Sequence, residues 1–179
     1  MGLKNRLFIM NKNEYTPLVE NSRGILEGYL DMCTSKPDID LSEVGFYWSP
    51  QLTGWGVRGV FTQYKPNSVF LAPVEDPFDK ANMPSRPGAI TPKIRRRLKK
   101  VYKENIKAIA PIVVHELTHM ADLRAKGRIR YALCCVPGLY NTMLDDKAFA
   151  NEKGAAYDLN LNADLYGREG KLLYNNGKV

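Results

Sequence analysis

The sequence predicts an α+β fold in a single domain that spans residues 1–179. The chain is long enough, and at 44% hydrophobic apolar enough, to bury one core, and its length demands no second domain. Segments with apolar residues at helical spacing stand before and after a group of segments rich in aromatic and β-branched residues. We therefore expect a short, mostly antiparallel sheet packed against helices.

The first helix is predicted from LVENSRGILEGYLDMC, in which apolar residues recur at helical spacing. Thr16 is a suitable N-cap, Pro17 suits the first helical position, and Pro37 ends the pattern. This helix would cover one face of the sheet.

Three strands are predicted next, from VGFYWS, GVRGVFTQY and SVFLAP, which Gly, Pro and Asn residues separate. The break at Lys65, Pro66 and Asn67 predicts a turn that joins the last two strands as an antiparallel pair. We expect SVFLAP, residues 68–73, to be an edge strand. A proline-studded stretch from Pro73 to Pro92 predicts an irregular connection that can rim a cleft.

A long helix is predicted from Thr91 to Lys126, before Gly127. Pro111 should kink this helix or divide it, because proline removes one backbone hydrogen bond and clashes with the preceding turn. After a loop that contains CCVPG, a final helix is predicted. It would begin near Thr142, with Asp145 at the capping spacing, and would end at Gly167 or Gly170.

The net charge of +7 is concentrated at the start of the long helix, residues 93–107. There a single acid, Glu104, accompanies eight basic residues: Lys93, Arg95, Arg96, Arg97, Lys99, Lys100, Lys103 and Lys107. We interpret the charges as a solvated face, with a buried stripe formed by Ile94, Leu98, Val101, Tyr102 and Ile106. The alternative is a patch for nucleic acid, an anionic membrane surface or an acidic partner.

Composition and termini predict a soluble protein that is cytoplasmic or otherwise intracellular. No apolar run approaches the length of a membrane span, and the apolar part of MGLKNRLFIM is too short for a secretory signal. The three cysteines, Cys33, Cys134 and Cys135, form no disulfide framework and read as buried small hydrophobes in a reducing compartment. Incorporation into a larger assembly stays open.

Both histidines of the chain lie in IVVHELTHMAD, one helical turn apart. On a helix, His115 and His119 share a face and can converge on one ion. Glu116 lies about 100° around the axis, so it can reach a water molecule at the metal instead of the metal itself. Neutral imidazoles bind zinc, and a nearby carboxylate can take a proton from water as the water attacks a carbonyl. This pattern predicts a zinc site with Glu116 as the catalytic base.

HELTH matches the HExxH motif of the zincin metallopeptidases, and the chain resembles them over roughly residues 55–165, with a predicted strand before the motif helix and a carboxylate-bearing helix after it. The further histidine of the metzincins is missing, so the chain resembles the gluzincin branch. That resemblance implies a zincin-like fold and a glutamate as third zinc ligand from a C-terminal helix.

Glu152 is the one glutamate between the motif and residue 168. NEKGA is similar to the NExxA sequence around the gluzincin ligand, which implies that Glu152 binds zinc. Ala148, Phe149, Ala155, Ala156 and Leu159 share its predicted face, so we expect the carboxylate to point inward and Phe149 to be buried. An exposed glutamate beside Lys153 is the alternative.

The remaining site residues are less determined. Gluzincins often carry an aspartate four residues after the ligand glutamate, and Ala156 stands there instead. Asp122 or Asp158 would then be the outer-shell acceptor that fixes an imidazole tautomer. Tyr131, Tyr140 and Tyr157 have the chemistry to stabilise an oxyanion.

These features predict a zinc metalloendopeptidase that hydrolyses a protein or peptide substrate. The substrate would lie as an extended segment along the edge strand. One alternative is a structural or assembly protein that keeps a zinc-bound zincin fold with little or no activity. Another is a nucleic-acid-associated protein that works through its basic helix.

Overall fold

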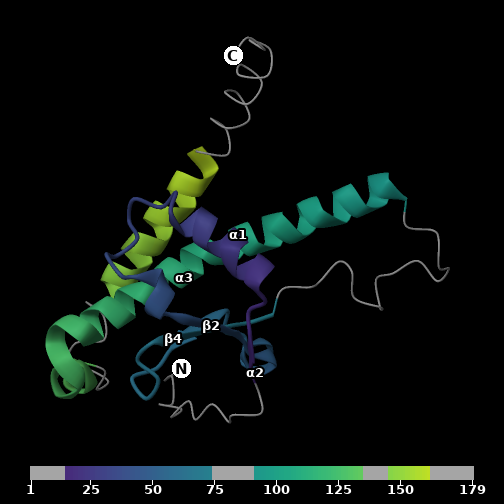
Figure 1. The fold of residues 1–179 in the computed structure, drawn as a ribbon. Coiled ribbons are helices and arrows are strands. Elements are labelled where there is room, and N and C mark those ends of the chain that lie inside the picture. Colours follow the sequence, from purple (N-terminus) through teal and green to yellow (C-terminus); the bar gives the residue numbers. More distant parts are fainter. Residues whose placement is uncertain (1–14, 74–90, 135–144, 162–179) are drawn as a thin grey trace.

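The computed structural model describes residues 15–73, 91–134 and 145–161, and the fold is α+β as predicted (Figure 1). The elements before the long helix are β1 (Thr16–Pro17), α1 (Glu20–Leu30), a 3-10 turn at Leu41–Glu43, β2 (Gly45–Trp48), α2 (Pro50–Gly54), β3 (Gly59–Phe61) and β4 (Ser68–Leu71). They are followed by α3 (Pro92–Cys134) and by a helix over residues 145–161, here the C-terminal helix. None of the helices in the described ranges is long and apolar enough to cross a membrane.

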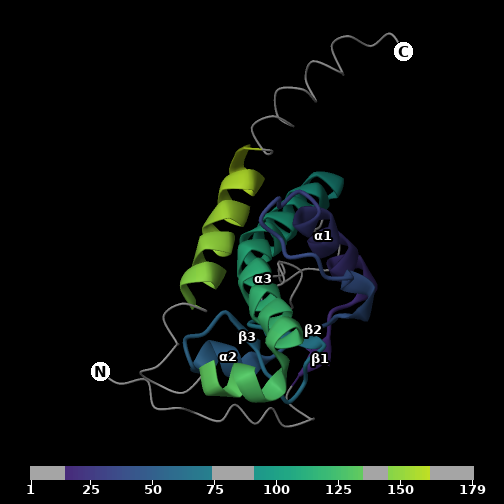
Figure 2. The ribbon, with the colours of Figure 1, turned by 90° about the vertical axis from the view of Figure 1, so that its left-hand side faces the viewer.

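The long helix α3 organises the molecule. It contacts α1, β3 and β4. In Figure 1 the sheet lies below α3, and α1 crosses α3. Figure 2 shows the C-terminal helix running beside α3, on the side away from α1. The motif residues therefore sit on an element that other parts of the chain cover.

The first described element is a strand, at residues where the sequence predicted a helix start. Thr16 and Pro17 pair antiparallel with Trp48 and Tyr47, and α1 begins only at Glu20. Proline is tolerated in an edge strand, where its missing N–H need not face a partner. The prediction of Thr16 as N-cap was wrong because pairing with a distant strand overrode the local capping signal.

The sheet is mixed, with the strand order β1-β2-β4-β3. The predicted antiparallel pair of β3 and β4 is confirmed, but β2 and β4 run parallel. The prediction of SVFLAP as an edge strand was wrong, since β4 lies between β2 and β3. Val69, Phe70 and Leu71 of β4 are all fully buried, as is usual for a central strand with both faces covered. The edge near α3 belongs to β3.

Pro111 does not divide α3. The backbone keeps helical angles through Pro111. Gly127, with φ of 74°, is non-helical, so α3 consists of two helices that meet at a kink there. The expected end of the helix before Gly127 is thus confirmed, because glycine adopts positive φ without the steric cost of a side chain. Around Pro111, the buried Ala110, Val113 and Val114 pack in the core, and this packing offsets one lost backbone hydrogen bond.

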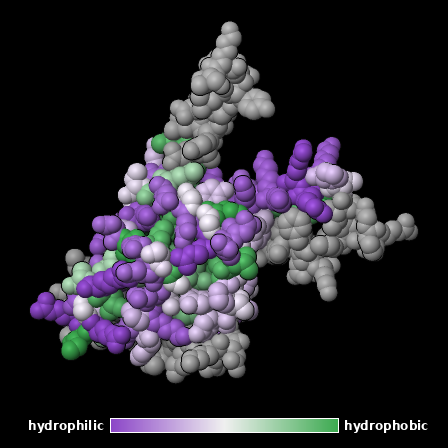
Figure 3. Space-filling view, in the orientation of Figure 1, coloured by the Kyte–Doolittle hydropathy of each residue, from purple (hydrophilic) through white to green (hydrophobic). Residues whose placement is uncertain are grey.

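The start of α3 is exposed. We call residues 92–105 the basic arm; Figure 1 shows it extending beyond the sheet and α1, and Figure 3 shows a hydrophilic surface there. The predicted buried stripe was wrong for Ile94 and Val101, which are 37% and 44% exposed. Tyr102 is half-buried and shares a hydrogen bond with Ser22, and Ile106 is the first fully buried residue of the stripe.

The main core gathers around the middle of α3. It joins residues of α1, β2, β4 and the C-terminal helix to one buried face of α3: Ile106, Ile109, Ala110, Val113, Val114, Leu117 and Met120. Cys33 is buried in the same core, as expected. Ala155 and Leu159 of the C-terminal helix belong to it, whereas Phe149 is 51% exposed and the expectation that it is buried was wrong.

Several predicted features lie outside the described residues. They are most of the proline-rich connection, the loop from Cys135 to Tyr140, the cap at Thr142, and the helix end at Gly167 or Gly170.

Candidate metal centre

A cleft of about 410 Å³ lies between α3, the start of β3 and the C-terminal helix. Three of its polar lining residues are His115, Glu116 and Glu152. The remaining lining residues are Arg58, Gly59, Ala108, Pro111, Ile112, Phe149 and Ala156. Three parts of the chain that are distant in sequence thus meet at the HExxH motif.

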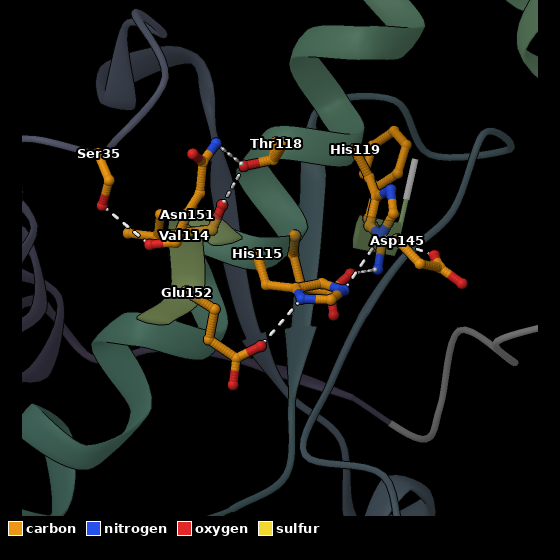
Figure 4. A network of polar contacts seen from close by, with 10 residues as sticks. Ser35, Val114, His115, Thr118, His119, Asp145, Asn151 and Glu152 are labelled. Carbon is orange, nitrogen blue, oxygen red and sulfur yellow. Dashed lines mark hydrogen bonds and ion pairs between the residues drawn. The ribbon is translucent and has the colours of Figure 1, made fainter. Parts of the chain in front are cut away.

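The two imidazoles face each other. Nε2 of His119 lies 3.1 Å from Nε2 of His115, and the ring centroids are 4.9 Å apart (Figure 4). This follows from their spacing of four residues on one helix. Burial, reinforced by the neighbouring His115, lowers the pKa of His119 to about 4. His119 is therefore neutral at pH 7, as a metal ligand must be.

Glu116 is buried and held at one oxygen. The Phe61 N–H of β3 donates to Oε2 at 2.7 Å. Burial raises the pKa of Glu116 to about 8, although the Phe61 hydrogen bond favours the ionised form. Its proton affinity is therefore close to that of a base working near neutral pH.

Gly59 allows β3 to approach α3 this closely. A Cβ at residue 59 would lie 2.7 Å from Cγ2 of Ile112 and 3.3 Å from Oε1 of Glu116. A side chain here would force Ile112 or β3 to shift, because real Cβ contacts are almost never this short. The missing side chain at residue 59 therefore helps to keep Glu116 at the cleft.

Two carboxylates of the C-terminal helix flank the imidazole pair (Figure 4). Oε2 of Glu152 lies 2.9 Å from Nδ1 of His115. Oδ1 of Asp145 lies 3.7 Å from Nε2 of His119. Glu152, the predicted third ligand, thus lies beside the pair, but it meets the ring edge of His115 that is opposite Nε2. Within the described ranges, no three His, Cys, Asp or Glu side chains surround one point as a metal would require.

Polar contacts fix the C-terminal helix against α3. Asn151 donates to the Thr118 hydroxyl at 3.0 Å, and that hydroxyl donates to the Val114 carbonyl at 2.8 Å. Ser35 donates to the Asn151 carbonyl at 2.9 Å. Figure 4 shows this network beside the imidazoles. Thr118 lies between the two histidines in sequence, and its partner Asn151 precedes Glu152. The bond between Thr118 and Asn151 therefore fixes where the carboxylates of the C-terminal helix lie along α3, relative to the imidazoles.

Of the two outer-shell candidates, Asp158 is engaged elsewhere. Its carboxylate accepts from the backbone N–H and the hydroxyl of Thr34, at 2.7 and 2.8 Å. It therefore anchors the chain after α1 to the C-terminal helix and bonds neither imidazole.

Asp122 is buried beside two lysines. Its Oδ1 accepts from Lys147 at 3.0 Å and pairs with Lys126 at 3.3 Å. Burial acts to raise the pKa of Asp122, but the lysines outweigh burial and lower it. Its Oδ2 and the Nδ1 of His119 are both buried without a hydrogen-bond partner in the described structure. The expected bond from His119 to Asp122 is not formed.

The two described tyrosine candidates, Tyr131 and Tyr157, do not line the cleft. Tyr131 is buried against Phe61, with ring centroids 6.2 Å apart, and Tyr157 is 67% exposed. Tyr140 lies outside the described residues.

Sequence reasoning missed Asp145 as a site residue and read it only as a capping partner. Its spacing was available as a signal, because residues seven apart on a helix lie on one face and Asp145 precedes Glu152 by seven. The Phe61 N–H was also missed, since no sequence pattern links β3 to Glu116.

Comparisons with protein-family models, curated proteins and solved structures found no match to this chain.

Proposed function

We propose that the chain is a zinc-dependent metalloendopeptidase, with zinc held by His115, His119 and a carboxylate of the C-terminal helix. The observation that carries the proposal is the placement of a buried carboxylate, Glu116, beside two imidazoles whose Nε2 atoms face each other at 3.1 Å. Two imidazole nitrogens and one carboxylate oxygen form a common donor set of catalytic zinc sites. Ligands on one tetrahedral zinc stand about 3.3 Å apart, close to the observed separation.

The protonation states around the imidazoles support this donor set. An ionised Glu152 only accepts, so Nδ1 of His115 carries the proton of their hydrogen bond. The lone pair of His115 then lies on Nε2, towards His119. If His119 also uses Nε2 as a ligand, its Nδ1 carries a proton that needs an acceptor. Oδ2 of Asp122, buried on the next turn of α3 and without a partner in the described structure, has the right chemistry to accept it.

Zinc, when bound, supplies a Lewis acid that polarises a carbonyl and makes water a better nucleophile. Glu116 would accept the water's proton at Oε1, because the Phe61 N–H already occupies Oε2. As the peptide C–N bond breaks, Glu116 would return that proton to the departing nitrogen. Fixing one oxygen on β3 keeps the other in position for both transfers.

An extended peptide is the substrate class that fits the cleft. Arg58 and Gly59 at the start of the edge strand β3 line it. A chain placed along this edge can form backbone hydrogen bonds with β3. The substrate edge is therefore β3 in place of the expected β4.

The test is metal analysis of the full chain together with cleavage of a peptide library. We expect one zinc per chain and cleavage that a chelator abolishes and added zinc restores. Zinc without cleavage of any library member would favour the structural or assembly alternative. A chain that binds no zinc after gentle purification and zinc addition would overturn both functions.

A second candidate function concerns the basic arm. All seven of its basic residues are exposed: Lys93, Arg95, Arg96, Arg97, Lys99, Lys100 and Lys103. Such a surface can neutralise nucleic-acid phosphates, and affinity would then fall steeply with salt. Titration of labelled duplex DNA and RNA at several salt concentrations tests this. Affinity that is absent at low salt, or unchanged when Arg95, Arg96 and Lys99 are replaced by Gln, would refute it.

A further inference from the structure

The two carboxylates that flank the imidazole pair have different relations to the ring nitrogens. From these relations we propose that Asp145 is the third metal ligand and that Glu152 is a positioning residue that holds His115. The inference rests on the zinc site of the proposed function. It reverses the role that the gluzincin resemblance implies for Glu152.

Glu152 already has a role that competes with metal binding. Its Oε2 is hydrogen-bonded to Nδ1 of His115 at 2.9 Å, on the ring edge opposite the Nε2 that faces His119. A carboxylate in this position fixes the tautomer and the ring orientation of a ligand histidine and makes its other nitrogen a better donor. To bind a metal shared by the two Nε2 atoms, Glu152 would have to give up this bond and pass around the ring.

Asp145 lies at the opposite end of the imidazole pair, beside His119. Its Oδ1 is 3.7 Å from Nε2 of His119, the same nitrogen that faces His115. Figure 4 shows Asp145 and Glu152 at opposite ends of the pair. This separation is a few tenths of an ångström longer than the value of about 3.3 Å expected between ligands on one zinc. Among the described residues no three such side chains surround one point, so zinc would have to draw Asp145 inward.

The packing of the C-terminal helix explains both positions. Residues 145 and 152 are seven apart, so they lie on one face of the helix, about 10.5 Å apart along its axis. This helix runs antiparallel to α3: Glu152 meets His115, Asn151 meets Thr118, and Lys147 meets Asp122. Because the helices are antiparallel, His119, which follows His115 on α3, lies beside Asp145, which precedes Glu152 on the C-terminal helix.

A simpler role for Asp145 is a surface carboxylate near the start of a helix. Two observations distinguish it from its neighbour Asp146. Asp145 is half-buried whereas Asp146 is exposed. Asp145 also contacts His119, and among the described residues no contact of Asp146 with either ring is found. Asp146 therefore provides a matched control.

The test compares Asp145→Asn, Glu152→Gln and the control Asp146→Asn in the full chain. Zinc affinity is measured by competition with a chelating dye. Visible absorption of the Co²⁺-loaded proteins reports which atoms bind the metal. We expect Asp145→Asn to lower zinc affinity by more than about 100-fold and to change the Co²⁺ spectrum. Glu152→Gln should lower affinity by roughly 10- to 100-fold and leave the spectrum close to wild type, because the bound atoms stay the same. Asp146→Asn should match wild type in both.

Circular dichroism in the presence of a chelator verifies that each variant is folded. If a variant fails to fold, Asp145→Glu replaces Asp145→Asn, and Glu152→Asp replaces Glu152→Gln. The first should keep zinc with an altered spectrum, and the second should keep the wild-type spectrum. A changed spectrum on substitution of Glu152, with an unchanged one on substitution of Asp145, would overturn the inference and leave the proposed zinc enzyme intact. Absence of zinc binding by the wild-type chain would instead overturn the proposed function.

Discussion

One helix, α3, holds two regions with opposite surroundings. The basic arm, residues 92–105, is exposed over most of its length, whereas the segment from Ile106 to Leu123, here the motif segment, lies in the core. Both keep the same helical backbone. Charges on the arm are exposed, whereas in the motif segment Glu116, Thr118 and Asp122 are hydrogen-bonded to other parts of the protein. Nδ1 of His119 is buried without a partner among the described residues. The two regions share one backbone conformation and differ in burial. Burial, and not helical conformation, therefore determines which of them can form a chemical site.

The largest expected difference between the two regions is in kcat, when one carboxyl in each region is replaced by an amide. Glu116→Gln cannot accept a proton, so kcat for peptide hydrolysis should fall by roughly 10²- to 10⁴-fold with zinc still bound. The control Glu104→Gln changes an exposed acid of the arm in the same way and should keep wild-type kcat. Steady-state kinetics and zinc analysis of the three proteins give the answer. Equal kcat for Glu116→Gln and wild type would remove Glu116 as the base.

The pH dependence of the unfolding free energy reports the raised pKa of the buried Glu116. Burial raises its pKa to about 8, so between the ordinary value of 4.5 and 8 the folded chain holds a proton that the unfolded chain has lost. This group's contribution to stability is therefore complete below pH 4.5 and falls as pH rises to 8, by several kcal/mol at roughly 1.4 kcal/mol per pKa unit. Urea unfolding in a chelator at pH 5 and pH 8 measures it. Glu116→Gln should lack this decline, and an identical decline in both proteins would refute the assignment.

Side-chain truncation should affect the two regions unequally. Leu117→Ala leaves a cavity in the core and should cost about 2–5 kcal/mol of unfolding free energy. Val101→Ala on the arm should cost less than about 0.5 kcal/mol, because its side chain is 44% exposed. Urea unfolding of both variants supplies the comparison. A cost above 1.5 kcal/mol at Val101 would mean that the arm is covered in solution.

Of the two regions of α3, only the motif segment should contribute to stabilisation by zinc. At a free concentration about 100 times its Kd, zinc should add about 2.7 kcal/mol of stability. His119→Ala should lose that increment, whereas Arg96→Ala on the arm should keep it. Thermal melts with zinc and with chelator measure the difference. An increment that survives in His119→Ala would place the metal away from the motif.

The carboxylates at the site show which contacts a local sequence pattern cannot predict. The NEKGA sequence led to the expectation that Glu152 binds zinc with the two imidazoles, and its carboxylate lies 2.9 Å from Nδ1 of His115. The pattern did not determine which ring nitrogen the carboxylate meets. That depends on the register of the C-terminal helix on α3, which Asn151, Thr118 and Ser35 set through contacts distant in sequence.

By itself, the sequence determined the α+β class, the β3–β4 pair, the helix that places both histidines on one face, and the end of that helix at Gly127. These features depend on short-range periodicity and on the conformations that single residues allow. Only the tertiary structure decided that Thr16 and Pro17 form a strand, that β4 is central, that Asp145 lies beside His119, and that the Phe61 N–H holds Glu116. Each of these depends on backbone pairing or helix register between distant segments, where long-range burial outweighs local preference.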